Sequence, residues 1–208
     1  MPSTIVHLAF AGIIAAALLG EYFDKKALAV VFVVIVFPDL DSFFIFTDAG
    51  HRTVLHNIWI PVLGFVVLWL DLQRKESFVR ERWGAWGVRV IWVTLVCYLL
   101  AHIALDLVDG AVNLFWPLYD QFYTMDGEIE LSSQHGIVQT FTDGGLPLLE
   151  ARGTTTEREI TTGIDPGEGE TERVFPIARN GWELVLLVGG IFITAVRLWQ
   201  VESGSQRQ

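Results

Sequence analysis

Five long apolar stretches alternate with polar segments and dominate the pattern of the chain. A helix needs about 20 apolar residues to cross a bilayer. The first stretch is marginal in length, and the second is interrupted by Pro38, Asp39 and Asp41. The pattern predicts an all-α membrane protein with about five transmembrane helices. The stretches cover residues 5–20, 27–46, 54–70, 88–108 and 182–199.

The segment between the fourth and fifth stretches differs in composition. Residues 110–181 carry twelve Asp and Glu against four Arg and no Lys. Alternating apolar and polar positions at 128–131, 137–141 and 172–177 predict short strands. The chain therefore divides into three parts. Residues 1–109 form a four-helix membrane core, residues 110–181 an acidic extracytoplasmic segment that is β-rich or irregular, and residues 182–208 a fifth helix with a cytoplasmic tail.

Basic residues predict the orientation in the membrane. Lys25 and Lys26 lie between the first two stretches, Arg74, Lys75, Arg80 and Arg82 lie between the third and fourth, and Arg197 precedes the tail. Loops rich in Lys and Arg stay in the cytoplasm. We therefore expect a multi-pass protein of the cell membrane with its N-terminus outside and its C-terminus in the cytoplasm.

Composition narrows the class of protein. Of the 208 residues 52% are hydrophobic, and eight are Trp, several of which flank apolar stretches as in interfacial belts. The formal net charge of −10 argues against a nucleic-acid partner. The single cysteine, Cys97, lies in an apolar stretch and is expected to be a buried small hydrophobe. No serine-nucleophile elbow, P-loop or His-Glu-x-x-His sequence is present.

Histidines and aspartates gather at the predicted outer face. Charged Asp residues within spanning segments are costly unless they face water, a cation or a donor. His102 and Asp106 are four residues apart and so share one face of a helix. Asp39 and Asp41 point the same way if the chain is extended there, and diverge if it is helical. His51 and His56 are five apart and need a turn to converge.

Imidazole and carboxylate groups suit Zn²⁺, with Mn²⁺ or Fe²⁺ as alternatives. We expect two or more divalent ions, with a spare carboxylate of Asp39 or Asp41 as general base. Arg52 either binds an anionic group such as phosphate or pairs with Asp48. His135 is expected to be solvated. The candidate metal ligands are His7, Asp39, Asp41, His51, His56, His102 and Asp106.

These residues, in this order, resemble a known family. The early His7 is followed by Pro38-Asp39-Leu40-Asp41, then by His51-Arg52-x-x-x-His56, then by His102-x-x-x-Asp106 and finally by Trp116-Pro117. The set resembles the YdjM-like family of membrane-bound metal-dependent hydrolases over roughly residues 1–120. That family is considered similar to zinc-dependent phospholipase C and the S1/P1 nucleases.

The third motif departs from the family pattern, in which His-Arg-Gly-x-Thr-His-Ser is usual. Thr53, Leu55 and Asn57 replace the Gly, the Thr and the Ser, while both histidines and Arg52 are kept. The resemblance implies a metal-site hydrolase without naming a substrate.

The expected function is a membrane-bound hydrolase that acts on a phosphoester, in a lipid or lipid-linked substrate, with metal-activated water. One alternative is a non-catalytic protein that binds or conducts a cation. A conducting path should continue as polar residues to the cytoplasmic side, but the inner halves of the helices, such as 13–19, 27–36 and 65–70, carry none, which disfavours a path across the membrane. A second alternative is a membrane anchor whose outer segment binds a partner protein.

Overall fold

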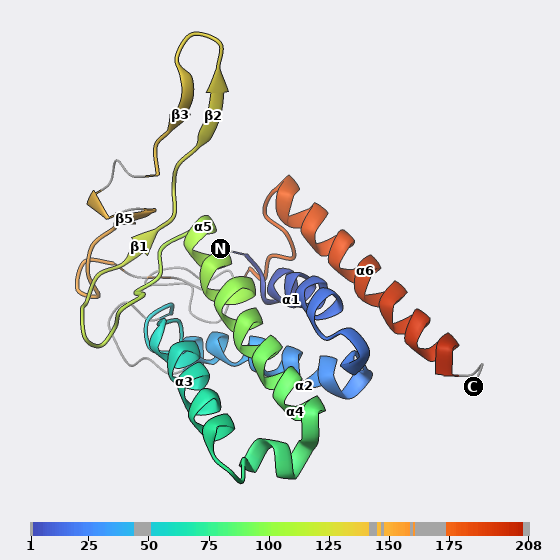
Figure 1. The fold of residues 1–208 in the computed structure, drawn as a ribbon. Coiled ribbons are helices and arrows are strands. Elements are labelled where there is room, and N and C mark those ends of the chain that lie inside the picture. The colour runs from blue at the N-terminus through green and yellow to red at the C-terminus, as the bar shows by residue number, and fades with distance from the viewer. Residues whose placement is uncertain are drawn as a thin grey trace.

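The computed structural model describes residues 2–43, 51–141, 145–146, 148–158, 160 and 174–205. Most of them are helical (Figure 1). The α-helices are α1 (Thr4–Leu18), α2 (Lys25–Val36), α3 (Trp59–Gln73), α4 (Phe78–Cys97), α5 (Leu105–Asp109) and α6 (Gly181–Ser205). Gly20–Tyr22 (η1) and Pro38–Phe43 (η2) are 3-10 helices, and Tyr98–Ala104 (η3) is a π-helix that joins α4 to α5.

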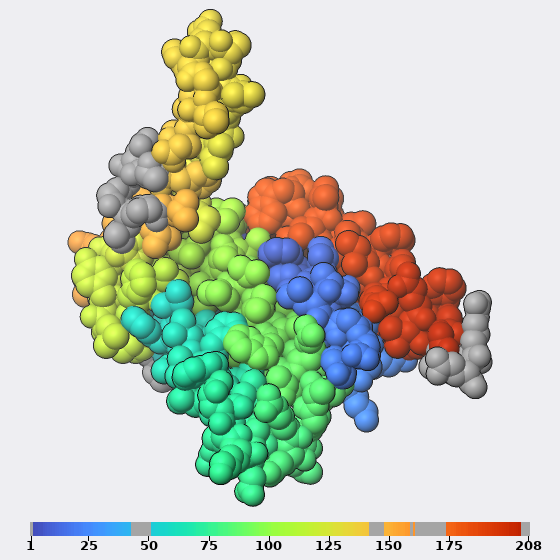
Figure 2. All heavy atoms as spheres, in the orientation of Figure 1, coloured from blue at the N-terminus to red at the C-terminus, as the bar shows by residue number. Residues whose placement is uncertain are grey.

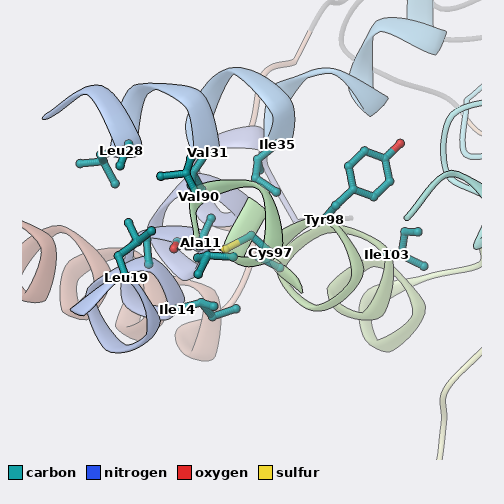
Figure 3. Close-up of a cluster of buried hydrophobic side chains, with 14 of the residues drawn as sticks. Ala11, Ile14, Leu19, Leu28, Val31, Ile35, Val90, Cys97, Tyr98 and Ile103 are labelled. Carbon is teal, nitrogen blue, oxygen red and sulfur yellow. Dashed lines mark hydrogen bonds between the residues drawn. The ribbon is translucent and has the colours of Figure 1, made fainter. Parts of the chain in front are cut away.

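The helical segment formed by α4, η3 and α5 lies at the centre of the bundle and packs against α1, α2 and α3. Figure 3 shows the core between these helices, where Ala11 and Ile14 of α1 face Val31 of α2 and Val90 of α4. These side chains are buried because each helix turns an apolar face inward. The polar residues described below lie at the end of this core where α4 passes into α5.

Small residues let α6 pack closely on α1 (Figure 1). A Cβ atom at Gly190 would overlap the carbonyl oxygen of Ala9, and one at Gly12 would overlap Oγ1 of Thr194. Such close backbone approaches are typical of helix pairs in membranes, where small residues line the contact. The opposite face of α6 is exposed, with Val185, for example, 73% accessible.

Within the described part of the chain, two helical segments are long and apolar enough to cross a bilayer. They are Phe78–Asp109, with 32 residues, and Gly181–Gly204, with 24. The helices α1 and α3 are apolar but have 15 residues each, and α2 has 12. The second predicted span is shorter than expected because α2 ends at Val36 and the chain continues as η2. The helical membrane class agrees with the prediction, whereas five crossings stay a prediction.

In its described residues, the outer segment forms two small antiparallel sheets. One has the order β1–β5–β4, with β1 at Tyr123–Thr124, β5 at Leu149–Ala151 and β4 at Gly145–Leu146. The other is a hairpin of β2 (Ile129–Ser132) and β3 (Gly136–Gln139) that projects from the bundle (Figure 2). The strands predicted at 128–131 and 137–141 are thus confirmed. The strand predicted at 172–177 is wrong over its described part, 174–177, which is irregular.

Candidate metal centre

Seven of the polar residues singled out in the sequence converge at one end of the bundle. Each comes from a segment that the helices hold in place: α1, η2, the connection that precedes α3, η3 and α5. Six of the side chains are at most 1% exposed, and the side chain of Asp39 is 16% exposed. The seven are His7, Asp39, Asp41, His51, His56, His102 and Asp106.

The first group of possible ligands joins α1 to the end of the central helix. Nε2 of His7 lies 3.5 Å from Oδ1 of Asp106, and Nε2 of His102 lies 3.7 Å from Oδ2 of Asp106. The rings of His7 and His102 stack with their centroids 4.3 Å apart. The expected sharing of one helix face by His102 and Asp106 is confirmed. The π-helix around His102 is a feature often found at functional sites.

The second group combines η2 with the connection before α3. Oδ1 of Asp39 lies 3.9 Å from Nε2 of both His51 and His56. The same oxygen is 3.6 Å from Nε2 of His102 and so also borders the first group. The other oxygen of Asp39 accepts a hydrogen bond of 2.5 Å from the Thr4 hydroxyl, which fixes the carboxylate.

The two groups meet where two ring nitrogens face each other. Nε2 of His56 lies 2.9 Å from Nε2 of His102, and 3.4 Å from Oδ2 of Asp106. Nδ1 of His56 lies 2.9 Å from Oδ2 of Asp41 and donates to it in the neutral ring, which leaves a lone pair on Nε2. His102 can then donate to His56, or both nitrogens can bind a cation.

Asp41 lies behind two of the histidines rather than among the converging nitrogens. Its Oδ1 accepts a hydrogen bond from Nδ1 of His51, and its Oδ2 accepts one from Nδ1 of His56. Asp39 and Asp41 therefore diverge, because η2 is helical. A carboxylate behind an imidazole fixes the tautomer and points the other nitrogen at the metal. The geometry differs from the expectation that Asp41 is itself a ligand or the general base.

Arg52 is buried and contacts Asp106. Nη2 of Arg52 donates to Oδ1 of Asp106, and Nη1 donates to the carbonyl oxygen of Asp106 over 3.4 Å. The backbone of Arg52 has a φ of 64°, which is uncommon for a residue other than glycine. Its guanidinium packs so tightly on Gly110 that a Cβ atom there would overlap Nη1. From its place in the sequence, Arg52 is predicted to bind an anionic group such as phosphate or to pair with Asp48. The structure shows Asp106 as its partner, and Asp48 lies outside the described residues.

Three of the histidines, His7, His51 and His56, are held through Nδ1 so that Nε2 is the nitrogen left for binding. Nδ1 of His7 lies 2.7 Å from the carbonyl oxygen of Ala101, to which it donates. Burial lowers the pKa of His51, and His56 lowers it further, so that the neutral, metal-binding form of the ring is favoured. Nε2 of His7, Nε2 of His51 and Oδ2 of Asp106 are buried and lack a hydrogen-bond partner within the part of the chain that is described.

These separations fit a divalent cation. Ligands about 2.1 Å from a tetrahedral zinc ion lie about 3.4 Å from one another. The separations of 3.4 to 3.9 Å between the nitrogens and carboxylate oxygens come close to that value. Within each group, His7, His102 and Asp106 or Asp39, His51 and His56, the ligand atoms all lie within 4.8 Å of one another. The cluster can therefore accept ions without moving its helices apart.

His135 lies apart from the cluster, exposed near the tip of the β2–β3 hairpin. The side chain of Asn57 forms hydrogen bonds with backbone groups. It donates to the carbonyl oxygen of Val54 over 2.6 Å and accepts from the amide of Trp59 over 3.1 Å, at the start of α3. The contacts of Arg52 with Asp106 and Gly110 could not be predicted from the sequence. The position of Arg52 next to His51 was the one feature that pointed to a role for this residue.

The fold and the cluster define a helical membrane protein with a buried histidine–aspartate centre of the kind that holds divalent cations. The chain belongs to the YdjM inner membrane protein family, whose model matches residues 1–162. The match contains all seven residues of the cluster and ends before α6. No curated protein and no solved structure matches the chain.

Proposed function

We propose that the cluster holds two divalent cations and hydrolyses a phosphoester bond in a lipid or lipid-linked substrate at the membrane. The observation that carries the proposal is the convergence of six ligand groups at separations suited to coordination. Separate hydrogen bonds on His7, His51 and His56 aim the remaining nitrogens inward. A set of four imidazoles and two carboxylates suits zinc, with manganese or iron as alternatives.

His7, His102 and Asp106 would hold one cation, and Asp39, His51 and His56 the other. A divalent cation at such a site supplies Lewis acidity and lowers the pKa of coordinated water towards 7. Asp41 orients His51 and His56 through their Nδ1 atoms. Arg52 orients Asp106, and its positive charge offsets part of the negative charge that is buried there.

Water and substrate would reach the centre at the edge of the cluster where Asp39 lies. Its side chain is 16% exposed, whereas the other six members are at most 1% exposed. Both oxygens of Asp41 accept from histidines, so Asp39 is the carboxylate of this pair that remains near the reacting groups. We assign Asp39 the role of ligand and proton acceptor. The orientation proposed from the basic residues places this edge at the outer face of the membrane.

The test of metal binding uses the purified full-length protein in detergent. We expect elemental analysis to find about two equivalents of a divalent metal in the wild type, and a loss of at least one equivalent in His102→Ala. The matched control is His135→Ala, which removes an exposed histidine of the hairpin and should leave the metal content unchanged. Sub-stoichiometric metal that is unaffected by His102→Ala would overturn the proposal.

The test of hydrolysis uses the same preparations with a chromogenic phosphodiester and with phospholipid vesicles. The wild type should release product, a chelator should abolish the release, and added zinc or manganese should restore it. Asp39→Asn should lower the turnover far more than it lowers the metal content. Equal activity in the wild type and in His102→Ala would show a contaminating hydrolase.

The burial of six members of the cluster also favours a second candidate, a centre that binds cations without catalysis. Closed sites with few openings to solvent are typical of structural metal sites. The two functions differ in one result. A non-catalytic centre would show full metal content and loss of stability on chelation, with no hydrolysis of any phosphoester tested.

A further inference from the structure

A second polar site lies at the opposite end of the central helical segment. Inside α4, Gly84 has a φ of 63° and a ψ of −156°, values outside the helical region. The chain therefore turns between the first six residues of α4, 78–83, and the straight part of the helix that runs towards His102. The lower end of α4 in Figure 1 shows this turn. A positive φ favours glycine, and a Cβ at Gly84 would meet no atom within 4 Å. The backbone conformation of the turn, and not a lack of space for a side chain, therefore accounts for glycine at position 84.

The turn forms one wall of a hollow of about 540 Å³. Arg80 reaches it from the segment before Gly84, and Arg89 from the straight part of α4. Tyr22 of η1 lines it beside the end of α1, and Val88 and Trp92 provide an apolar wall. The hollow thus combines two cations and a hydroxyl with a surface that hydrocarbon can contact.

Neither guanidinium has a carboxylate within 4 Å in the described ranges. Arg80 donates to the carbonyl oxygen of Leu72 and Arg89 to that of Leu18, each over 3.5 Å. Both contacts are long and leave most of the donors of each fork available. Lys25 and Arg152, by contrast, form ion pairs of 2.6 and 2.7 Å. Guanidinium groups match the geometry of phosphate, so a phosphate would complete this site.

The level of the hollow fits the headgroups of a bilayer. Arg89 precedes His102 by 13 residues, which corresponds to about 20 Å along the helix axis. Arg80 lines the same hollow from the other side of the turn at Gly84, and the hydrocarbon core of a bilayer is about 30 Å thick. Trp83 is 46% exposed beside the turn, as expected for an indole at a membrane interface. Basic pockets between membrane helices bind anionic headgroups.

We propose that this hollow binds the phosphate of an anionic phospholipid at the membrane face opposite the candidate metal centre. Arg80 and Arg89 hold the phosphate from two sides of the turn, Tyr22 donates its hydroxyl, and Val88 and Trp92 contact the upper part of an acyl chain. The site is independent of the proposed hydrolysis because it shares no residue with the histidine–aspartate cluster and lies at the other end of the helix.

The test measures lipid binding to the full-length protein in detergent by native mass spectrometry and by thermal unfolding. The probes are phosphatidylglycerol and phosphatidylcholine of the same chain length. We expect the wild type to bind phosphatidylglycerol about tenfold or more tightly than phosphatidylcholine and to unfold at a higher temperature in its presence. The double variant Arg80→Ala/Arg89→Ala should lose this preference.

The matched control is Arg74→Ala/Lys75→Ala. It removes the same charge from two exposed residues that lie close by in the chain but do not line the hollow. The control should keep the preference, and both double variants should unfold at the same temperature as the wild type in detergent without lipid, which shows that the bundle is folded. An equal loss in the two double variants would mean that diffuse positive charge attracts the lipid, and would overturn the site.

Two further outcomes also contradict the proposal. The first is a wild type that binds phosphatidylcholine as tightly as phosphatidylglycerol. The second is an equal stabilisation by inorganic phosphate at the same concentration, which would identify a free anion rather than a lipid as the ligand.

Discussion

The two ends of the helical segment Phe78–Asp109 carry charged side chains under opposite conditions. At the α5 end, Asp106 is 1% exposed and is paired with Arg52 and bordered by histidines. At the α4 end, Arg80 and Arg89 are exposed and have no carboxylate partner in the described part of the chain. At the buried end, Arg52 holds Asp106, and two histidines hold Asp41. At the exposed end, the guanidinium groups of Arg80 and Arg89 remain available to a molecule from outside.

The difference shows how one apolar helix supports two kinds of recognition. A buried carboxylate is tolerated only with partners, because its desolvation costs several kcal/mol. Such partners fix its position to a degree that metal coordination requires. An exposed guanidinium at a membrane interface remains hydrated, so leaving it unpaired costs little free energy. An anionic headgroup that approaches it is attracted electrostatically. Substitutions at the two ends should therefore have very different effects on stability.

The largest effect is expected for Arg52→Ala. The change leaves the Asp106 carboxylate buried without its cation, and breaking a buried pair in this way costs about 3–5 kcal/mol. The measurement is the free energy of unfolding in detergent after metal has been removed. Arg52→Lys should recover part of the loss, because it keeps the charge with the same backbone. The control Arg152→Ala removes an exposed pair with Glu150 and should cost about 0–1 kcal/mol.

Asp41→Asn should have the next largest effect, and on metal affinity rather than on folding. The amide has about the same shape but can no longer accept from both His51 and His56 as a carboxylate does. Loss of such a supporting group lowers metal affinity about 10–100-fold. Competition with a chelator of known affinity measures it. Asp126→Asn, on the exposed outer segment, should have no effect, and an equal loss there would point to the overall charge instead.

Gly110→Ala should destabilise the protein by about 1–3 kcal/mol through overpacking. The new methyl group would overlap Nη1 of Arg52, and the guanidinium would have to move away from Asp106. Gly181→Ala, where nothing lies within 4 Å, is the matched control. In an Arg52→Ala background the cost of Gly110→Ala should disappear. Additive costs would show that the two residues do not interact.

The smallest effect is expected at the other end of the helix. Without anionic lipid, Arg80→Ala and Arg89→Ala should each change the free energy of unfolding by no more than about 0.5 kcal/mol, as is usual for exposed residues. A cost similar to that of Arg52→Ala would mean that these arginines hold the bundle together. That result would remove the contrast between the two ends.

Much of the candidate centre was accessible from the sequence because it depends on helical periodicity. His102 and Asp106 had to share a face once the segment was helical, and the apolar stretches fixed which residues would be near one end of the bundle. The different placements of Asp39 and Asp41 were not accessible. They depend on η2 being a 3-10 helix, and the sequence allowed an extended chain equally well.

The sequence by itself determined a helical membrane protein in which histidines and aspartates lie at one end of apolar segments, because hydrophobic spacing and the cost of buried charge are local properties of the chain. Tertiary structure alone decided that Asp41 supports His51 and His56, that Arg52 pairs with Asp106, and that Arg80 and Arg89 border a common hollow. Arg52 and Asp106 are 54 positions apart, and Asp41 contacts histidines 10 and 15 positions away, so neither contact follows from the period of a helix or a strand. Their partners are chosen by how the helices pack, which no local pattern encodes.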